Sequence, residues 1–452
     1  MDDARLEEPK MPLLEKLGLH RPELRSWAMY EWAITGMYAV IVTAVFPIYF
    51  ASVAAADLGG GRTSQVYALA NTVGIFVVGL TAPLLGALTD TNPIKKRLLG
   101  LFAGIGAAAV CGLFFVEEGG WVLGVALFIV VNIGVNASTV FYDSLLPHVA
   151  RRDEVDRVST GAFAVGYVGS GLLLVVGLLI IQAPGLFGIP DGTLPSRIVF
   201  VLTGLWWAGF TLPLLRNVPE PAPEITLEPG ERPLPAAGRR LLITFRSLRG
   251  YREAFLLLIA YFIYGDGIGT IIRLATIYGT EIGIDQTTLI VSIVIVQFVG
   301  IPFAFAFGAM AERISTKKAL LVGVTAYAGI TVLGYFMTTG WHFVALAILV
   351  GTVQGGTQAL SRSLFASMIP AARSGEFFGF FGVIDKFSGF MGPAVFAIVS
   401  AQLGSSRNGI LSVIVFFIVG GLILTRVDVD AGRARAVAEQ ARIEREGAVR
   451  EW

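Results

Sequence analysis

The stretch GALTDTNPIKK, residues 86–96, returns in the second half of the chain as GAMAERISTKK, residues 308–318. In both copies an acid follows the glycine by four residues, and two adjacent lysines begin five residues after the acid. Each matched position lies 222 residues after its counterpart, which is about half of the 452-residue chain. A constant offset over several positions indicates internal duplication. The repeat therefore predicts a chain of two similar halves.

The composition places these halves in a membrane. Hydrophobic residues make up 55% of the chain and charged residues only 15%, whereas an ordinary soluble domain is roughly 25% charged. A hydrocarbon core of about 30 Å requires about 20 apolar residues per helix. The runs that meet this requirement are twelve: 26–54, 64–90, 98–117, 121–147, 158–182, 198–215, 251–280, 286–311, 319–338, 342–369, 376–402 and 408–426. The sequence predicts an all-α integral membrane protein with twelve transmembrane helices in two six-helix bundles.

Several other classes of protein are excluded by what the chain lacks. The net charge of +1 gives no reason to expect nucleic-acid binding, and a single cysteine, Cys111, cannot form an intrachain disulfide. The three histidines, His20, His148 and His342, all lie outside the predicted bilayer centre, so neither a metal site nor a histidine proton relay is supported. No G-x-x-x-x-G-K-[ST] motif is present to bind ATP. We expect no metal, no cofactor and no enzymatic activity.

The orientation in the membrane follows from the positive charges in short loops. The loops after the second, fourth, eighth and tenth spans hold ten lysines and arginines, whereas the loops after odd-numbered spans hold three. Positive loops remain in the cytoplasm, so both termini are predicted to be cytoplasmic. The first 25 residues lack the apolar core and cleavage site of a signal peptide, so the first span is expected to stay attached.

One long polar connection, which begins RNVPEPAPEITLEPGERPLP at residue 216, separates the sixth and seventh spans. Its prolines and acids are typical of a flexible linker. Five segments follow: a cytosolic N-terminal segment 1–25, a six-helix bundle 26–215, a cytosolic linker 216–250, a second bundle 251–426 and a cytosolic tail 427–452. Within GRRLLITFRSLRGYR, residues 238–252, leucines and phenylalanine alternate with arginines, which suits a helix on an anionic leaflet or a basic loop without a special role.

The repeated motif suggests how the two halves hold one conformation. Glycine allows two helices to approach closely, and the acid and bases can pair across the cytoplasmic ends. We interpret the two motifs as a conformational latch, whose residues are Gly86, Asp90, Lys95, Lys96, Gly308, Glu312, Arg313, Lys317 and Lys318.

Polar side chains that share one helix face occur clearly in four spans, the first, fourth, seventh and tenth. Residues spaced by four and seven positions lie on the same face of a helix. The sets are Glu31, Thr35 and Tyr38; Asn132, Asn136, Thr139 and Asp143; Asp266, Thr270 and Arg273; and Gln354, Gln358 and Ser361. These spans lead four three-helix units, as expected of inverted repeats that place a binding site at their interface.

Two of these residues, Asp266 and Arg273, are charged groups inside an apolar run. Two helical turns separate them by about 10.5 Å, so they face the same way but do not neutralise each other directly. Both should point into the bundle, because a charge that faces lipid costs about 2.5 to 3.5 kcal/mol. Either Asp266 pairs with Lys386 as a rigid strut, or Asp266 and Arg273 contact the charged ends of a zwitterion or act as a protonation switch.

The other intramembrane charges leave further alternatives. Glu31 and Asp143 suit either substrate contact or a gate that pairs with Arg151, Arg152 or Arg157. Arg362 is expected to form a structural ion pair with Asp385, or to pair with Glu376, since the tenth and eleventh spans are sequence neighbours. Lys386 remains a candidate for the site. The amides Asn132, Asn136, Gln354 and Gln358 suit either substrate contact or hydrogen bonds across helices.

Several stretches resemble one family. The glycine, acid and lysines of the repeat are similar to the signature of the major facilitator superfamily. GTQALSRSLFASMIP (356–370), EFFGFFGVIDKFSGFMGP (376–393), YGDGIGTIIR (264–273) and FPIYF (46–50) resemble its branch with the autophagy-linked fungal vacuolar amino-acid effluxer and its bacterial relatives. That branch commonly has Tyr-Asp-Trp-Ala-Asn-Ser where this chain has Tyr-Glu-Trp-Ala-Ile-Thr at 30–35, and Phe-Tyr-Asn where it has Phe-Tyr-Asp at 141–143. The substrate is therefore not inherited from the resemblance.

The resemblance implies a fold of two bundles around a cavity that these spans line, and a secondary carrier that works by alternating access. We expect the substrate to be a small polar solute, most readily an amino acid. The expected direction of transport is efflux, and the proton is a candidate coupling ion. We expect the protein to lie in a bacterial inner membrane and to be a monomer. The alternative is a carrier-like protein that does not transport and acts as a sensor or as an assembly partner of a membrane complex.

Overall fold

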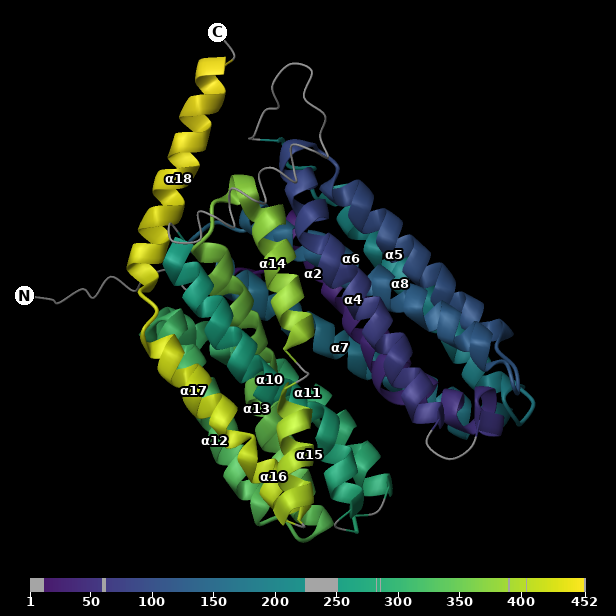
Figure 1. Ribbon diagram of the computed structural model, residues 1–452. Coiled ribbons are helices and arrows are strands. Elements are labelled where there is room, and N and C mark those ends of the chain that lie inside the picture. Colours follow the sequence, from purple (N-terminus) through teal and green to yellow (C-terminus); the bar gives the residue numbers. More distant parts are fainter. Residues whose placement is uncertain are drawn as a thin grey trace, which may run out of the picture.

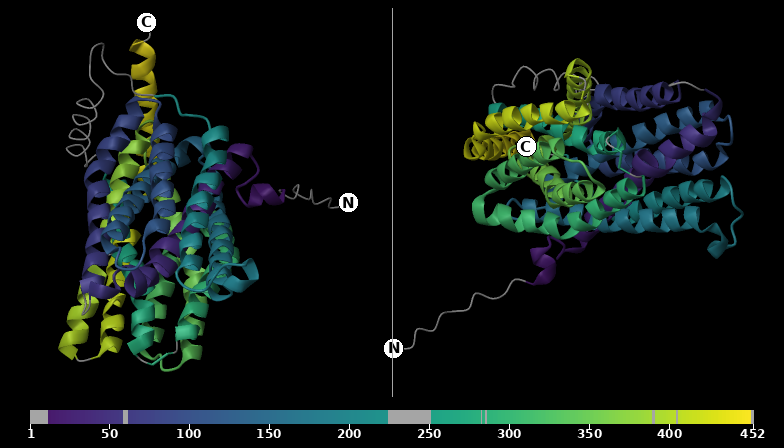
Figure 2. Two further views of the ribbon diagram at one scale, coloured as in Figure 1. Left: turned by 90° about the vertical axis from the view of Figure 1, so that its right-hand side faces the viewer. Right: turned by 90° about the horizontal axis from the view of Figure 1, so that it is seen from below.

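The computed structural model of the chain describes residues 12–58, 62–223, 251–281, 283–284, 286–388, 391–403 and 405–450, and their regular secondary structure is helical. The predicted basic segment 238–252 lies almost entirely outside the described residues, as does most of the linker. Figure 1 shows two groups of long helices, one from each half of the sequence. Seen from below in Figure 2, the two groups lie side by side.

The first half begins with a long helix that is not uniform. It runs from α2 (Pro22–Met37) through a π-helical stretch η1 (Tyr38–Ala44), α3 (Val45–Tyr49) and a second π-helical stretch η2 (Phe50–Ala54). The remaining long helices are α4 (Arg62–Thr91), α5 (Lys95–Gly112), α6 (Trp121–Val149), α7 (Val155–Gln182) and α8 (Leu194–Asn217). Short helical turns are α1 (Leu13–Lys16), η3 (Ala56–Leu58), η4 (Leu113–Phe115) and η5 (Pro184–Phe187).

The second half repeats this arrangement and adds a terminal helix. Its elements are α10 (Arg252–Glu281), α11 (Gln286–Ile314), α12 (Thr316–Tyr335), α13 (Gly340–Ser367), η7 (Ala371–Arg373), α14 (Ser374–Phe387), α15 (Met391–Leu403), α16 (Ser406–Ser412), α17 (Ile414–Thr425) and α18 (Val429–Arg450). Among the described residues, ten helical segments are long and apolar enough to cross a membrane. The two other predicted spans, 64–90 and 376–402, correspond to α4 and to the pair α14 and α15.

The predicted span 376–402 is not one helix but two. α14 ends at Phe387, and Ser388 has a ψ of 85°, which does not continue the helix. The sequence there, SGFMGP from residue 388, brings two glycines and a proline into an otherwise apolar run. Glycine and proline disfavour a helix interior, so the interruption is a local property of these residues.

The two halves meet through two equivalent pairs of helices. α4 packs against α14, and α7 packs against α11. The glycines of the repeated motif lie in these contacts: a Cβ on Gly86 would lie 1.9 Å from the carbonyl oxygen of Gly375, and a Cβ on Gly308 would lie 2.4 Å from Thr160 Oγ1. We call the end of the molecule where these motifs lie the closed end.

Replacement of Gly86 by alanine should force α4 and α14 apart. Overpacking of this kind costs about 1 to 3 kcal/mol, and the atom that the new Cβ would meet belongs to the backbone. The reporter is Ala82→Cys in a Cys111→Ser background, since Ala82 is 3% exposed and its carbonyl oxygen would lie 2.8 Å from a Cβ on Gly379 of α14. We expect a water-soluble maleimide to label this thiol faster in Gly86→Ala than in the parent.

Gly104→Ala on α5 is the matched control, because a Cβ on Gly104 would meet no atom within 4 Å. Both substitutions gain the same helix propensity, so any difference between them comes from the helix contact. Equal labelling in the two variants would contradict a closure that depends on Gly86.

Candidate functional site

A cavity of about 930 Å³ lies between the two halves and is lined by both. This volume is within the range of about 300 to 1,000 Å³ that is typical of small-molecule sites. Its wall is largely apolar and aromatic, with a few polar groups. Seven predicted residues line it: Glu31, Thr35, Tyr38, Asp143, Arg273, Gln354 and Gln358. Four others are not among the lining residues, namely Asn132, Asn136, Asp266 and Lys386; the side chain of Lys386 lies outside the described part of the chain.

The two predicted asparagines of α6 lie behind the cavity wall. Both are buried, and each side-chain amide donates to the carbonyl oxygen four residues earlier, at 2.9 Å for Asn132 and 2.8 Å for Asn136. The Oδ1 of Asn136 accepts a 3.0 Å hydrogen bond from the hydroxyl of Tyr38, which lines the cavity. Of the two alternatives for these amides, the structure shows bonds within and across helices, and Asn136 orients a cavity residue.

Arg362 of α13 occupies the floor of the cavity, where it joins the two halves. Its Nη1 lies 3.0 Å from Glu31 Oε2 on α2 and 3.1 Å from Asp143 Oδ1 on α6. Its Nε donates to Ser159 Oγ on α7 at 3.0 Å, and its Nη2 to the Ser159 carbonyl oxygen at 3.3 Å. One arginine of the second half is therefore held by three helices of the first half.

Aromatic rings surround this guanidinium and exclude water from it. Arg362 Cζ lies 4.6 Å from the ring centre of Phe163, 5.1 Å from Trp27 and 5.5 Å from Tyr142, within the range of cation–π contacts. Trp27 and Tyr142 stack on each other at 4.4 Å. Arg362 itself is only 4% exposed. A buried charge of this kind is tolerated only because two carboxylates and a serine satisfy its donors.

The floor corrects two predictions of charge pairing. Arg362 pairs with Glu31 and Asp143 and not with Asp385, whose Oδ1 accepts a 2.5 Å hydrogen bond from the Tyr261 hydroxyl. The alternative partner, Glu376, lies 2.8 Å from Arg373. Likewise, the cation that Glu31 and Asp143 contact is Arg362 and not Arg151, Arg152 or Arg157. Adjacency in sequence suggested these pairings, but α13 packs against α7 and α6 of the other half, which brings Arg362 to the first-half carboxylates.

Asp266 does not line the cavity; it caps a helix. The residue is fully buried, and its Oδ2 accepts a 2.8 Å hydrogen bond from the backbone N–H of Gly392, in the first turn of α15. A carboxylate is favourable there because the first N–H groups of a helix lack intrahelical acceptors. Its other oxygen, Oδ1, has no hydrogen-bond partner among the described residues. Asp266 thus holds the second part of the interrupted helix, a role that no pattern in the sequence predicted.

Arg273 lies two turns further along α10 and faces the cavity. It is exposed there and lines the wall with Tyr261 and Gln297. It forms no ion pair and no hydrogen bond with the described residues. Arg273 is therefore a cation in the wall that a ligand can reach, whereas Arg362 on the floor is already occupied.

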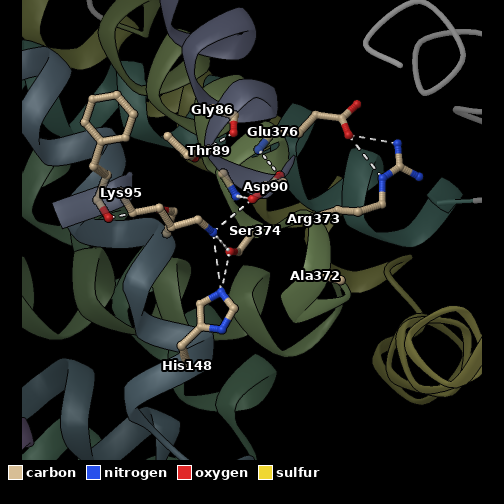
Figure 3. A network of polar contacts seen from close by, with 12 residues as sticks. Gly86, Thr89, Asp90, Lys95, His148, Ala372, Arg373, Ser374 and Glu376 are labelled. Carbon is tan, nitrogen blue, oxygen red and sulfur yellow. Dashed lines mark hydrogen bonds and ion pairs between the residues drawn. The ribbon is translucent and has the colours of Figure 1, made fainter. Parts of the chain in front are cut away.

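The first copy of the repeated motif joins the two halves by a hydrogen-bonded network (Figure 3). Asp90 Oδ1 accepts from the backbone N–H of Gly375 and Oδ2 from that of Glu376, both at 2.8 Å. Lys95 Nζ lies 2.9 Å from Asp90 and donates to Ser374 Oγ at 2.7 Å. Asp90 of the first half therefore caps the first turn of α14 in the second half.

His148, to which no sequence pattern assigned a role, completes this network. Its Nε2 lies 3.0 Å from Ser374 Oγ and 3.4 Å from Lys95 Nζ. Lys96, the second lysine, turns away and donates to the carbonyl oxygen of Val218, at the end of α8. No pattern in the sequence marks Ser374 or His148, because their function depends on the contact between the halves.

The second copy makes an equivalent but different contact with α7. Glu312 lies 2.7 Å from Arg157, and Thr316 donates to Asp156 at 2.5 Å. Lys317 stays within its own half and donates to the carbonyl oxygens of Thr425 and Val427 at 2.8 and 2.7 Å. Neither Arg313 nor Lys318 forms a hydrogen bond or ion pair within the described part of the chain.

Comparison with known proteins assigns the family. The family model described as "Vacuole effluxer Atg22 like" matches residues 20–437. The chain belongs to the Atg22-like family. This Atg22-like chain is 35% identical over 410 residues to the "Uncharacterized MFS-type transporter YxiO" of Bacillus subtilis (strain 168), a match that covers 89% of the chain and 94% of YxiO. It is thus an MFS-type transporter related to the Atg22 effluxer, and a multi-pass membrane protein.

More distant relatives agree with this assignment. "Autophagy-related protein 22-1" of Penicillium rubens is 26% identical over 313 residues, which cover 64% of the Atg22-like chain and 52% of the fungal protein. The chain therefore spans about half the length of its fungal relatives. The FucP transporter in the outward conformation matches with a TM-score of 0.68 at 13% identity, over 91% of this chain and 99% of FucP. The proton:xylose symporter XylE matches with a TM-score of 0.68 at 12% identity, over 90% of this chain and 95% of XylE. The fold is the major facilitator fold of twelve helices in two bundles.

Replacement of Asp90 by asparagine should loosen the closed end. Asparagine keeps one acceptor oxygen but loses the charge that strengthens both backbone hydrogen bonds and the contact with Lys95, and charge-assisted bonds contribute about 1.5 to 3 kcal/mol. We expect faster labelling of the Ala82→Cys reporter. Asp153→Asn, at an exposed acid, is the control and should label like the parent.

Replacement of Arg362 by glutamine should destabilise the fold, because two carboxylates would remain buried without a cation. Loss of one partner of a buried pair typically costs about 3 to 5 kcal/mol. We expect a lower Tm in detergent, and part of the loss should be recovered in Glu31→Gln/Asp143→Asn/Arg362→Gln. If the triple variant is no more stable than Arg362→Gln, the floor is not held by these charges.

Proposed function

We propose that the chain is a secondary carrier that moves small amino acids by alternating access. The observation that carries this proposal is the floor of the cavity, where Arg362 of one half is bound by Glu31 and Asp143 of the other. The two bundles can separate at that point only if this ion pair is released. A cavity that ends at such a pair is suited to a solute that competes for its charges.

The proposed orientation puts the closed end in the cytoplasm of a bacterium. The lysines and arginines of the loops favour this side, and the positive-inside rule keeps such loops in the cytoplasm. The cavity then faces outward, as the similarity to FucP in its outward conformation also suggests. Two bundles, 26–215 and 251–426, would move as rigid bodies joined by the linker 216–250, in a monomer.

Arg273 is the proposed site for the carboxylate of the substrate. An arginine binds a carboxylate through two parallel hydrogen bonds, and this one is exposed in the cavity wall. The amino group would approach the floor, where two carboxylates face one guanidinium and leave a net negative charge. Tyr38 and Tyr167 in the wall offer apolar surface for a side chain. This division replaces the expectation that Asp266 and Arg273 together bind a zwitterion.

The same geometry suggests how the substrate would open the gate. An ammonium group that pairs with Glu31 and Asp143 competes with Arg362 for the same oxygens. Weakening of the Arg362 contacts would release α13 from the first half, and only the contacts of the two motifs, at Asp90 and at Glu312, would then hold the closed end. Substrate binding would thus shift the equilibrium between the outward-facing and inward-facing states toward the inward-facing one. The size of the shift is set by the difference between the substrate's affinities for the two states.

Asp266 is the proposed site for a coupling proton. Its Oδ1 has no hydrogen-bond partner among the described residues, so a proton can be added there without loss of an existing bond. Protonation would remove the charge that favours the N-terminus of α15 and weaken the cap at Gly392. A change at Asp266 would therefore reach the interrupted helix, whose other part, α14, carries the latch.

The test is counterflow of a labelled amino-acid mixture into proteoliposomes preloaded with the same unlabelled mixture. The parent should accumulate label, and Arg273→Gln should reduce the initial rate by about tenfold or more, the loss expected for one charge-assisted contact. Arg97→Gln is the control, since Arg97 is exposed at the closed end and should be neutral. No uptake by a well-folded parent would remove amino acids as substrates and leave another solute or a sensor. Uptake that Arg273→Gln does not change would contradict the carboxylate site.

A further inference from the structure

The last helix, α18, extends from the closed end beyond the two bundles (Figure 1). Within the described part of the chain, its first half, as far as Gln440, contacts α10, the end of α13 and the short turn η7. Gly432, Ala436 and Glu439 are buried on one side, at the spacing of a single helix face. The opposite side is exposed, including Val437 and Ala438. α18 is therefore docked on its own half through a narrow face.

What α18 contacts is the segment between α13 and α14. Gln440 Oε1 accepts a 3.0 Å hydrogen bond from the backbone N–H of Ala372, and Arg433 Nε donates to Ser367 Oγ at 3.2 Å. A Cβ on Gly432 would lie 2.7 Å from the sulfur of Met368. One helix thus contacts the segment 367–373 near both of its ends, at Ser367 and Met368 and at Ala372.

The same segment leads directly into the latch. Arg373 lies 2.8 Å from Glu376, donates to the Tyr251 hydroxyl at 3.2 Å, and precedes Ser374, the first residue of α14. Figure 3 shows Ala372 and Arg373 next to the contacts of Asp90 with α14. Two consecutive backbone N–H groups must point at one carboxylate for that contact to form, so the position of this turn determines the strength of the latch.

The N-terminal segment similarly contacts the residues that bind the second motif, where Glu312 pairs with Arg157 of α7. Arg21 donates to the carbonyl oxygen of Val149 at 2.9 Å and pairs with Glu154, just before α7 begins. Gly18 has a φ of +68°, and a Cβ there would lie 2.6 Å from the backbone of Arg157. Arg157 is the residue that receives Glu312. Each terminus of the chain therefore braces the helix start that receives the motif of the opposite half.

We propose that α18 is a conformational brace of the latch. When docked, it orders residues 367–373 in advance, so that α14 presents its N-terminus to Asp90 without an entropic cost of ordering the turn. When undocked, the turn is free, the latch is weaker, and the carrier populates the inward-facing state more. Any cytosolic factor that binds the docked face of α18 would act on transport through this equilibrium. The device requires only that the two halves separate at the closed end, and is independent of the solute.

The experiment compares Ala436→Glu with Ala438→Glu in the full-length chain. Ala436 is fully buried against the body and Ala438 is exposed, so the same charge is placed on the docked or the free face. In proteoliposomes, with the maleimide on the cytoplasmic side, the Ala82→Cys reporter should be labelled about fivefold faster in Ala436→Glu, roughly the effect of one net hydrogen bond. Ala438→Glu should label like the parent. Gln440→Ala, a milder change, should lie between the two.

Equal labelling in Ala436→Glu and Ala438→Glu, while Asp90→Asn labels faster than both, would overturn the brace. A second measurement excludes simple misfolding. In an Asp90→Asn background the latch is already weakened, so Ala436→Glu should add less than it does in the parent; a further increase by the same factor would mean that α18 acts elsewhere. Labelling needs no substrate, so its outcome is separate from that of the counterflow test.

Discussion

The structure depends on one buried guanidinium that two carboxylates share. Arg362 carries its charge almost fully buried at the floor of the cavity, and Glu31 and Asp143 of the other half supply its compensation. Each half on its own would therefore contain buried charges without a partner, Arg362 in the second half and Glu31 and Asp143 in the first. The bundles must meet at this point in the described state, and whatever lies in the cavity lies directly above the charges that hold them together.

Helix ends provide the second recurring element. Asp90 caps α14 from the opposite half, and Asp266 caps α15 from α10. Both parts of the interrupted eleventh span therefore begin at a carboxylate from another helix. Hydrogen bonds of this type are directional and easily lost on a small rotation, which suits contacts that must form in one state and break in another. The glycines at 86, 375 and 392 give the backbones the space for this approach.

Local patterns were sufficient for the duplication, for the spans other than 376–402, and for the seven of eleven predicted site residues that line the cavity, because hydropathy and helical periodicity are properties of short segments. Partner choice was not predictable in this way. Arg362 was assigned to Asp385 from adjacency in the chain, whereas its partners are 331 and 219 residues away. Asp266 was expected at the cavity, but its role depends on where the next helix is interrupted. Ser374 and His148 form their hydrogen bonds across the contact between the halves, so their role cannot be predicted from either segment alone. The pairing of Asp266 with Lys386 and the basic segment at 238–252 stay predictions, since they concern side chains and residues outside the described part.

The two latches are unequal, although the sequence motif is repeated. The side chain of Asp90 is 3% exposed, whereas that of Glu312 is 44% exposed and pairs with a single arginine. Dissolved salt screens the exposed pair and hardly reaches the buried one. The halves would therefore separate in two stages. α7 and α11 would part first, while α4 and α14 would stay in contact until the buried contacts of Asp90 break. Ionic strength on that side of the membrane would then alter the first stage of opening and leave the final one unchanged.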